Sequence, residues 1–313
     1  MNRRAMLAAS SAFLAVPVAV NAAGPTAVKI AGVPEESITP ALWAQQSGMF
    51  RRAGLDVDIV PQNSGAAIAA GVAGGSFAFG KSGIVSVIIA HSRNVPIVLV
   101  AGGGLYDAKI ANVVLVVKGD SPLKTAADLN GKTIGVSGIN DLTTLAAKSW
   151  LDQHGGDSST LKIVEFPFSV VAEGLATGRI DAGGLAEPEL EGFVRSGKVR
   201  VFANFFDAIA PQFMYSGWFT TTDYIAKNRT TVEAFARAMR ESSAYVNAHE
   251  VATAGVLAKF TAVEQGRIEK MRRISYPTSL DPRLLQPVIN ACAKYKIIPA
   301  VFDAKEMIAS LSR

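Results

Sequence analysis

The chain has 313 residues, 49% of them hydrophobic, and a formal net charge of +5, which suits one large or two medium-sized lobes with buried cores. Its lysines and arginines are dispersed, without basic runs or interleaved aromatic residues, which argues against a nucleic-acid partner. Cys292 is the only cysteine, and the three histidines lack metal-ligand spacing, so the sequence predicts no intrachain disulfide and no metal site.

Residues 1–23 predict an export signal. Arg3 and Arg4 precede an apolar run over residues 5–20, and small residues then favour cleavage after Ala22 or Ala23. The run is too short and too rich in alanine for a membrane span, and no cysteine stands at the cleavage point for a lipid anchor. We therefore expect a periplasmic mature protein without a lipid anchor, with Sec and Tat export both open.

After this leader, strand and helix patterns alternate as far as about residue 100. The expected strands are 27–33, 55–60, 76–79 and 97–100, and the expected helices are 39–50, 64–74 and 83–91. Such alternation implies βαβ units and a mainly parallel sheet.

The alternation restarts near Asn112 and ends near Thr220. Strands are expected at 113–117, 133–136, 161–165 and 180–183, with helices at 126–129, 142–154 and 170–177. The rest reads as helical. A capping box is expected at 230–233, an apolar face is formed by Val232, Phe235, Ala236, Met239 and Val246, and further helices are expected at 264–273, 281–295 and 304–312.

Residues 75–82 fit the phosphate-binding pattern GxxxxGK[ST]. That loop needs a buried strand before its first glycine and a helix that begins at the lysine. Here a helix precedes Gly75, and Phe77 and Phe79 alternate as in a strand, so we do not predict a nucleotide site. Residues 80–83 are instead expected to form a strand-to-helix turn, whose free N–H groups and cation suit an anion.

Several blocks of the chain are shared with one group of transport proteins. They are 42–44, 48–50, 54–57, 63–65, 73–75, 80–82, 178–182 and 187–188, together with the most specific set, 116–121, 128–132 and 135–136. With these blocks, residues 28 to about 250 resemble the importer-binding proteins of the aliphatic sulfonate, taurine and THI5-like (NMT1-like) group.

The resemblance implies an α/β, two-lobed periplasmic binding protein fold of type II-like form. Each lobe would be a mainly parallel sheet flanked by helices, with a helical C-terminal part. Lobe 1 would comprise residues 24–111 and 221–313, and lobe 2 residues 112–220. The implied function is capture of a small, anionic organic molecule in the cleft between the lobes and its delivery, by a monomer without a cofactor, to the membrane subunits of an ABC importer.

The same resemblance implies a set of ligand-binding residues at strand ends and helix starts. They are Pro34, Glu35, Asn63, Ser64, Gly65, Lys81, Ser82 and Tyr106 from lobe 1, and Ser137, Asn140, Asp141, Leu142 and Glu187 from lobe 2.

For several of these residues a second interpretation stays open. Asn140 and Asp141 also suit a helix N-cap, and Glu187 also suits a solvated turn. Lys81 favours an anionic ligand group, unless it bridges to Glu35 or Glu187. Those acids favour a ligand that also donates hydrogen bonds, so a sulfonate, a carboxylate, a pyrimidine and nitrate all remain candidates.

An enzyme that acts on a small pyrimidine or carboxylate is the alternative. THI5-like relatives that make the thiamine pyrimidine with iron carry a cysteine-rich cluster and a reactive histidine, whereas this sequence has one cysteine. It also lacks a GxSxG nucleophile elbow. We therefore predict binding without catalysis.

Overall fold

The computed structural model of the chain describes residues 24–62 and 64–311. The predicted export signal and the predicted cleft residue Asn63 lie outside the described residues. Among the helices that are described, none is long and apolar enough to cross a membrane.

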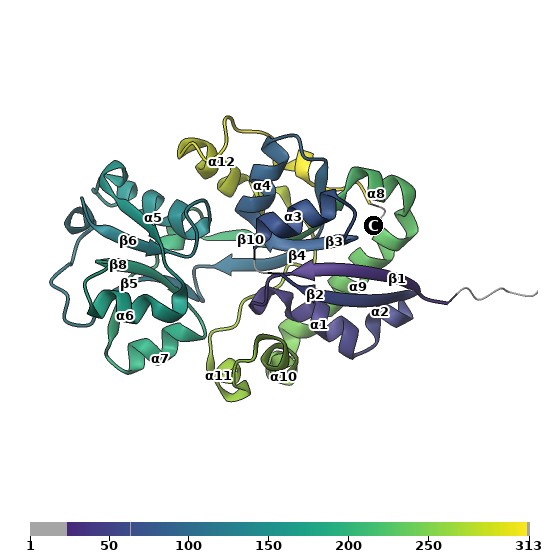
Figure 1. Cartoon of the computed structure of the whole chain (residues 1–313), viewed down its shortest axis with the longest axis horizontal. Coiled ribbons are helices and arrows are strands. Elements are labelled where there is room, and N and C mark those ends of the chain that lie inside the picture. Colours follow the sequence, from purple (N-terminus) through teal and green to yellow (C-terminus); the bar gives the residue numbers. More distant parts are fainter. Residues whose placement is uncertain (1–23, 63, 312–313) are drawn as a thin grey trace, which may run out of the picture.

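The first sheet has five strands in the order β2-β1-β3-β10-β4 (Figure 1). They are β1 (Thr26–Gly32), β2 (Leu55–Pro61), β3 (Phe79–Gly83), β4 (Ile97–Asp107) and β10 (Gln212–Thr221). Strand β1 pairs in parallel with β2 and β3, whereas β10 is antiparallel to both β3 and β4. Four strands therefore run the same way, and β10 runs against them.

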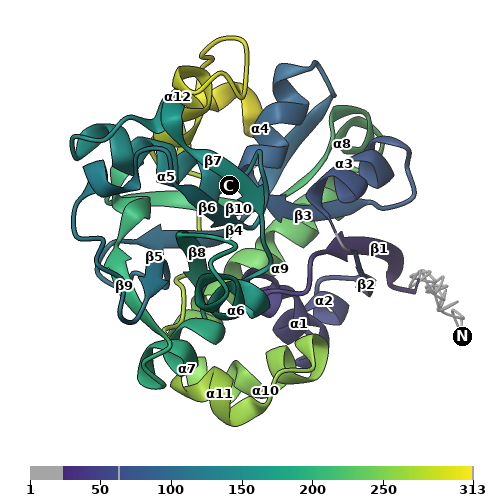
Figure 2. The ribbon, with the colours of Figure 1, turned by 60° about the vertical axis from the view of Figure 1, so that its left-hand side comes forward.

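The second sheet repeats this plan with the order β7-β6-β8-β5-β9 (Figure 2). Its strands are β5 (Val113–Lys118), β6 (Thr133–Val136), β7 (Lys162–Glu165), β8 (Ala182–Ala186) and β9 (Val199–Ala203). Strand β6 is parallel to β7 and β8, and β5 is antiparallel to β8 and β9. The predicted α/β class with two mainly parallel sheets is confirmed.

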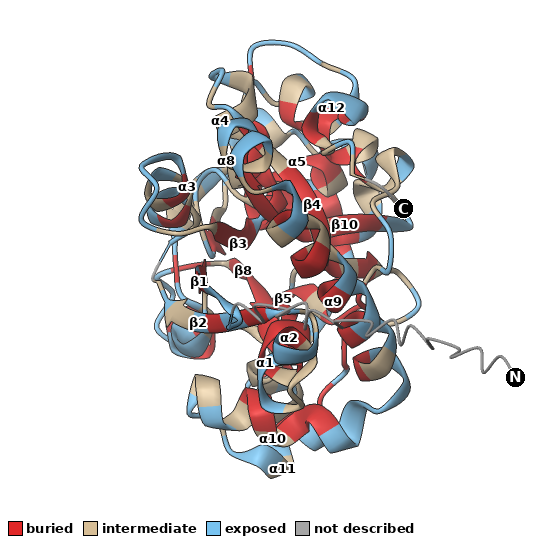
Figure 3. Ribbon diagram, turned by 90° about the vertical axis from the view of Figure 1, so that its right-hand side faces the viewer, coloured by how far each residue is buried: buried red, intermediate tan, exposed pale blue. Residues whose placement is uncertain are grey.

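Helices flank both sheets and leave the strands as the most buried elements (Figure 3). The α-helices are α1 (Thr39–Gln46), α2 (Met49–Arg52), α3 (Gly65–Ala73), α4 (Ile84–Ser92), α5 (Leu142–Gln153), α6 (Val171–Ala176), α7 (Glu189–Arg195), α8 (Thr222–Lys227), α9 (Arg229–Ala248), α10 (Glu250–Thr261), α11 (Gln265–Lys270) and α12 (Gln286–Lys294). Short 3-10 helices lie at η1 (Glu36–Ile38), η2 (Ala126–Leu129), η3 (Ser158–Thr160), η4 (Phe168–Val170), η5 (Phe205–Ala208), η6 (Pro282–Leu284) and η7 (Ala304–Met307).

The longest helix, α9, packs its apolar face on the first sheet. Of the five residues predicted for this face, Val232, Phe235, Met239 and Val246 are buried, whereas Ala236 is only partly buried. The rings of Phe235 and Phe79 stack with a centroid distance of 4.0 Å, which fixes the helix over β3. The predicted capping box is wrong, because α9 already begins at Arg229 and its N-cap residue, Asn228, makes no side-chain capping bond.

Strand β3 lies later in the chain than the alternation of Phe77 and Phe79 suggested. It covers Phe79–Gly83, and Lys81 stands opposite Gly32 of β1 and Trp218 of β10. Because this segment pairs with β1 on one side and β10 on the other, residues 80–83 belong to the strand. Helix α4 begins directly after it, at Ile84. The predicted strand-to-helix turn with free N–H groups is wrong.

The C-terminal helices are shorter than their patterns indicated. The helix expected at 264–273 is α11, which ends at Lys270, and the one expected at 281–295 divides into η6 and α12. A helix was also expected at 304–312. Of that range the structure describes residues 304–311, where it has the 3-10 helix η7 and then a bridge from Ile308 to Leu99 of β4.

Two connections join the sheets, one between β4 and β5 and the other between β9 and β10. The predicted lobe boundaries remain predictions. Because β10 pairs with β3 and β4, we propose that lobe 2 ends before Gln212 rather than at residue 220.

Candidate ligand-binding cleft

A cavity of about 550 Å³ opens where strands of both sheets end. The first lobe contributes the segment after β1, residues 33–36, and Lys81. The second lobe contributes Ser137 after β6, Phe168 after β7 and Glu187 after β8. This arrangement follows the rule that ligand sites of open α/β sheets lie beyond the carboxyl ends of their strands.

Most of the predicted cleft residues do line this cavity. They are Pro34, Glu35, Lys81, Tyr106, Ser137, Asp141, Leu142 and Glu187.

Ser64, Gly65, Ser82 and Asn140 are not part of the cavity lining. Ser64 caps α3 by accepting a hydrogen bond from the N–H of Ala67 at 3.2 Å. Gly65 packs on the buried Ser82, since a Cβ at Gly65 would lie 2.0 Å from the Ser82 Oγ. Asn140 is exposed to solvent. The start of α3 therefore packs against the first lobe. The prediction that these four residues bind the ligand is not supported by the cavity lining.

Lys81 is the most deeply buried charged group in the cleft, with 1% of its side chain exposed. Its Nζ forms an ion pair with the Glu35 carboxylate and has no hydrogen-bond partner among the described residues. Burial lowers the pKa of the Lys81 ammonium to about 7. The structure thus contains the internal bridge to Glu35 that the sequence left open.

The carboxylate of Glu35 stays partly accessible. Its side chain is 38% exposed, and it caps η1 by accepting hydrogen bonds from the N–H of Ser37 at 3.0 Å and from the Ser37 hydroxyl. Because water can still reach Glu35, its carboxylate would lose little on leaving Lys81, whereas the buried Lys81 would need another anionic partner.

Asp141 combines the two roles that its sequence context suggested. As the N-cap of α5 it accepts hydrogen bonds from the N–H groups of Thr143 at 2.9 Å and Thr144 at 3.1 Å. The Ser137 hydroxyl also donates to it at 2.5 Å. Burial raises the pKa of Asp141 despite these hydrogen bonds. The helix-cap interpretation is confirmed, and the carboxylate also faces the cavity.

Glu187 follows β8 on the second lobe and is half-buried. Burial raises its pKa, while hydrogen bonds from the backbone N–H groups of Glu191 and Arg272 and the charge of Arg272 act in the opposite direction. The Glu191 bond is 3.3 Å long. Glu187 is therefore no solvated turn residue, because it joins the second lobe to the segment after α11.

Tyr106 lies at the end of β4 where the chain leaves the first sheet. Its ring packs against Phe206 and Phe213, with centroid distances of 5.3 and 5.0 Å, and its hydroxyl donates a hydrogen bond to Asp207. Burial, together with the Asp207 carboxylate, raises the Tyr106 pKa. Phe206 and Asp207, from the connection between β9 and β10, thus fix the ring of Tyr106, which the resemblance had placed among the ligand-binding residues.

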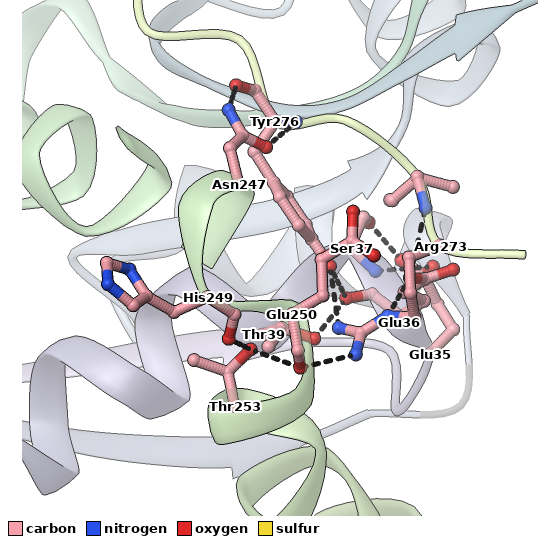
Figure 4. A network of polar contacts seen from close by, with 11 residues as sticks. Glu35, Glu36, Ser37, Thr39, Asn247, His249, Glu250, Thr253, Arg273 and Tyr276 are labelled. Atoms are coloured by element: carbon pink, nitrogen blue, oxygen red, sulfur yellow. Dashed lines mark hydrogen bonds and ion pairs between the residues drawn. The ribbon is translucent and has the colours of Figure 1, made fainter. Parts of the chain in front are cut away.

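A polar network next to the cleft was not predicted (Figure 4). The Nε of Arg273 donates to the Glu36 carboxylate at 2.6 Å, and its Nη1 donates to the Glu250 carbonyl at 3.1 Å. The N–H of Ile274 also donates to Glu36, at 3.1 Å, and the hydroxyl of Tyr276 donates to the Glu36 carbonyl at 3.2 Å. Burial raises the pKa of Glu36.

The walls of the cavity carry more acids than bases. Glu35, Glu36, Asp141, Glu187 and Glu189 line it, whereas Lys81 is the single basic residue in the described lining. Two of these acids form ion pairs within the protein, Glu35 with Lys81 and Glu36 with Arg273. On the second lobe, Asp141 and Glu187 line the cavity, and neither belongs to a salt bridge within residues 24–62 and 64–311.

Three comparisons place the chain among known proteins. A protein of Brucella abortus (strain 2308) with the name "Putative binding protein" is 26% identical over 275 residues, covering 86% of this chain and 82% of that protein. The formylaminopyrimidine-binding protein of Halalkalibacterium halodurans is 31% identical over 140 residues, 44% of this chain and 40% of its own length.

The fold has solved counterparts. The crystal structure of the periplasmic aliphatic sulphonate binding protein from Escherichia coli superposes with a TM-score of 0.75 at 18% identity, covering 93% of this chain and 94% of that chain. This similarity confirms the two-lobed periplasmic binding protein fold, and these relatives are binding proteins rather than enzymes. Since the family model described as "NMT1/THI5 like" matches residues 35–253, the chain belongs to the NMT1/THI5-like family.

Proposed function

We propose that the mature chain is an exported, monomeric solute-binding protein that captures one small organic molecule and delivers it to the membrane subunits of an ABC importer. The observation that carries this proposal is the cavity of about 550 Å³, whose walls come from both lobes. Its size is typical of small-molecule sites, which range over roughly 300–1,000 Å³. A ligand that touches both lobes stabilises their closed arrangement by its differential affinity for it.

The charges in the cavity support a ligand with two chemically different ends. An anionic group, the class expected from the sequence, would replace the Glu35 carboxylate as the partner of the buried Lys81. N–H donors at the other end would bond to Asp141 and Glu187, which have acceptor oxygens facing the cavity. A pyrimidine with amino groups would use the second set of contacts, and the similarity to a formylaminopyrimidine-binding protein makes that class worth testing.

Catalysis has no comparable support. Cys292 is fully buried, and burial raises the pKa of its thiol to about 12, so it behaves as a small apolar residue and not as a nucleophile. No cluster of three or more potential metal ligands occurs in the described part of the chain.

We expect one member of a panel of formylaminopyrimidine, butanesulfonate, benzoate and nitrate to raise the melting temperature. A ligand present at 100 times its dissociation constant should stabilise the folded protein by about 2.7 kcal/mol. Isothermal titration should then give one site per chain, and chromatography should recover the compound unchanged.

Blocking the cavity provides the control. Ser169 is exposed and lines the cavity from the second lobe, so Ser169→Trp should fill it and abolish the thermal shift. Ser76 is equally exposed but is not part of the cavity lining, and Ser76→Trp should bind as the parent does. Steady conversion of the compound, or unchanged binding by Ser169→Trp, would show that the proposal is wrong.

A further inference from the structure

The segment between α11 and η6 runs along the cleft with two consecutive arginines. Residues 272–274 form neither helix nor strand. Arg273 has 4% of its side chain exposed, whereas Arg272 is exposed to solvent. In an extended chain successive side chains point to opposite faces, so the two arginines can bind different partners.

Arg273 attaches this segment to the first lobe. Its guanidinium pairs with Glu36, which lies just after β1, and also reaches the Glu250 carbonyl at the start of α10 (Figure 4). The peptide N–H of Ile274 adds a second hydrogen bond to Glu36. Three hydrogen bonds therefore hold the segment against the cleft floor of the first lobe.

Arg267 reaches the second lobe instead, and the guanidinium of Arg272 reaches the connection that leads into it. The Nη1 of Arg272 donates to the Ala111 carbonyl at 3.2 Å, and the Nη2 of Arg267 donates to the Pro188 carbonyl at 3.1 Å. Ala111 belongs to the connection from β4 to β5, and Pro188 directly precedes α7, which lies beside α11 in Figure 2. The two contacts thus join α11 and the segment that follows it to the second lobe and to the connection that leads into it.

The two acceptor sites are themselves connected through a residue of the cavity. The N–H of Glu187 donates to the Asn112 carbonyl at 3.1 Å, which links the neighbours of Pro188 and Ala111. The Glu187 carboxylate in turn accepts a hydrogen bond from the backbone N–H of Arg272. Glu187 also lines the cavity, so the interlobe contact and the ligand site share one side chain.

We propose that residues 267–273 form a clasp that holds the two lobes closed, with Arg273 as its anchor on the first lobe and Arg267 as its side-chain contact on the second. Arg272 adds a side-chain contact to the connection between the lobes and a backbone N–H bond to Glu187. Arg272 is then a positioning residue for Glu187. The importance of the clasp rests on the proposed function, because closure retains the solute. Its existence can be tested without any ligand.

The test measures the distance between the lobes in the full mature protein. Spin labels on Arg51→Cys of the first lobe and Lys198→Cys of the second, both exposed positions, report this distance by double electron–electron resonance in a Cys292→Ala background. We expect one short distance for the parent. In the double variant Arg267→Met/Arg272→Met the population at longer distances should rise at least fivefold.

Two further variants separate the clasp from a general loss of charge or of folding. Lys270→Met removes a cation from the same helix, and Lys270 makes no hydrogen bond or ion pair to the second lobe within residues 24–62 and 64–311, so its distances should match the parent. The single variant Arg272→Lys, with Arg267 unchanged, keeps the cation. It should keep most of the short-distance population that the double variant loses. Melting temperatures should agree throughout.

Two results would overturn the clasp. One is a distance distribution of the double variant that equals the parent's, and the other is a parent that is already open without ligand. Solute binding in the thermal-shift panel could still succeed in either case, so the failure of the clasp is distinguishable from the failure of the proposed function.

Discussion

Replacing Arg273 by methionine should lower the free energy of unfolding by about 3–5 kcal/mol, the usual cost of removing one partner of a buried ion pair. Only 4% of the Arg273 side chain and 10% of the Glu36 side chain are exposed, and their N–O distance is 2.6 Å. In the variant the Glu36 carboxylate would stay buried. Within the described residues, the backbone N–H of Ile274 would be the hydrogen-bond donor that remains to it. Urea unfolding followed by circular dichroism and tryptophan fluorescence measures the loss.

An exposed pair of the same length provides the matched control. Arg283 lies 2.6 Å from Asp281 but is 90% exposed, so Arg283→Met should leave the unfolding midpoint unchanged within error, because solvent already screens that pair. The double variant Glu36→Gln/Arg273→Met removes both charges and should recover part of the loss. An Arg273→Met protein as stable as the Arg283→Met protein would contradict this account.

The sequence predicted most strands whose signal is local, although it missed β9, in which Val199 and Val201 alternate with Arg200 and Phe202. Runs such as the one in β5 alternate or stay apolar within a few residues, and their pattern alone identifies them. Strand β10 was missed because Gln212, Ser216 and Gly217 interrupt its apolar residues, and its place in the sheet depends on pairing with β3 and β4. The same long-range pairing decides where β3 begins, which the alternation of two phenylalanines could not show.

The cleft was predictable to the extent that it follows from strand order. The carboxyl ends of parallel strands meet at one edge, so residues that follow β1, β6 and β8 were expected to gather there, and Glu35, Ser137 and Glu187 do. The pair of Glu36 and Arg273 is separated by 237 residues. No local pattern encodes such a contact, and the partner of Lys81 stayed undecided for the same reason.

Replacing Lys81 by methionine should stabilise the ligand-free protein at and below neutral pH. Lys81 is 1% exposed and titrates near pH 7 in the folded protein, against 10.5 for an ordinary lysine. That shift corresponds to about 5 kcal/mol at 1.36 kcal/mol per pH unit. Because the folded-state pKa already includes the surroundings of the lysine, we expect Lys81→Met to gain up to about 5 kcal/mol at and below pH 7. Glu35 itself loses little, since its carboxylate is 38% exposed and stays hydrated.

The pH dependence identifies the cause of this gain. Between pH 7 and 10.5 the unfolded chain binds the Lys81 proton and the folded protein does not, so the parent should become more stable as pH rises through this window. Lys81→Met lacks that contribution, and the two proteins should converge near pH 10.5. Urea unfolding at pH 6, 8 and 10 measures the difference, with Lys118→Met as the control because Lys118 is 48% exposed in its pair with Asp120.

The same variant tests which end of the ligand Lys81 binds. If an anionic group takes the place of Glu35, Lys81→Met should weaken its binding by about 2–5 kcal/mol, the cost of leaving one partner of a buried pair without the other. A ligand held only through N–H donors to Asp141 and Glu187 should bind Lys81→Met as tightly as the parent. A variant that is less stable than the parent at pH 6 would instead show that the bridge to Glu35 outweighs the desolvation of the lysine, and that Lys81 is a structural residue.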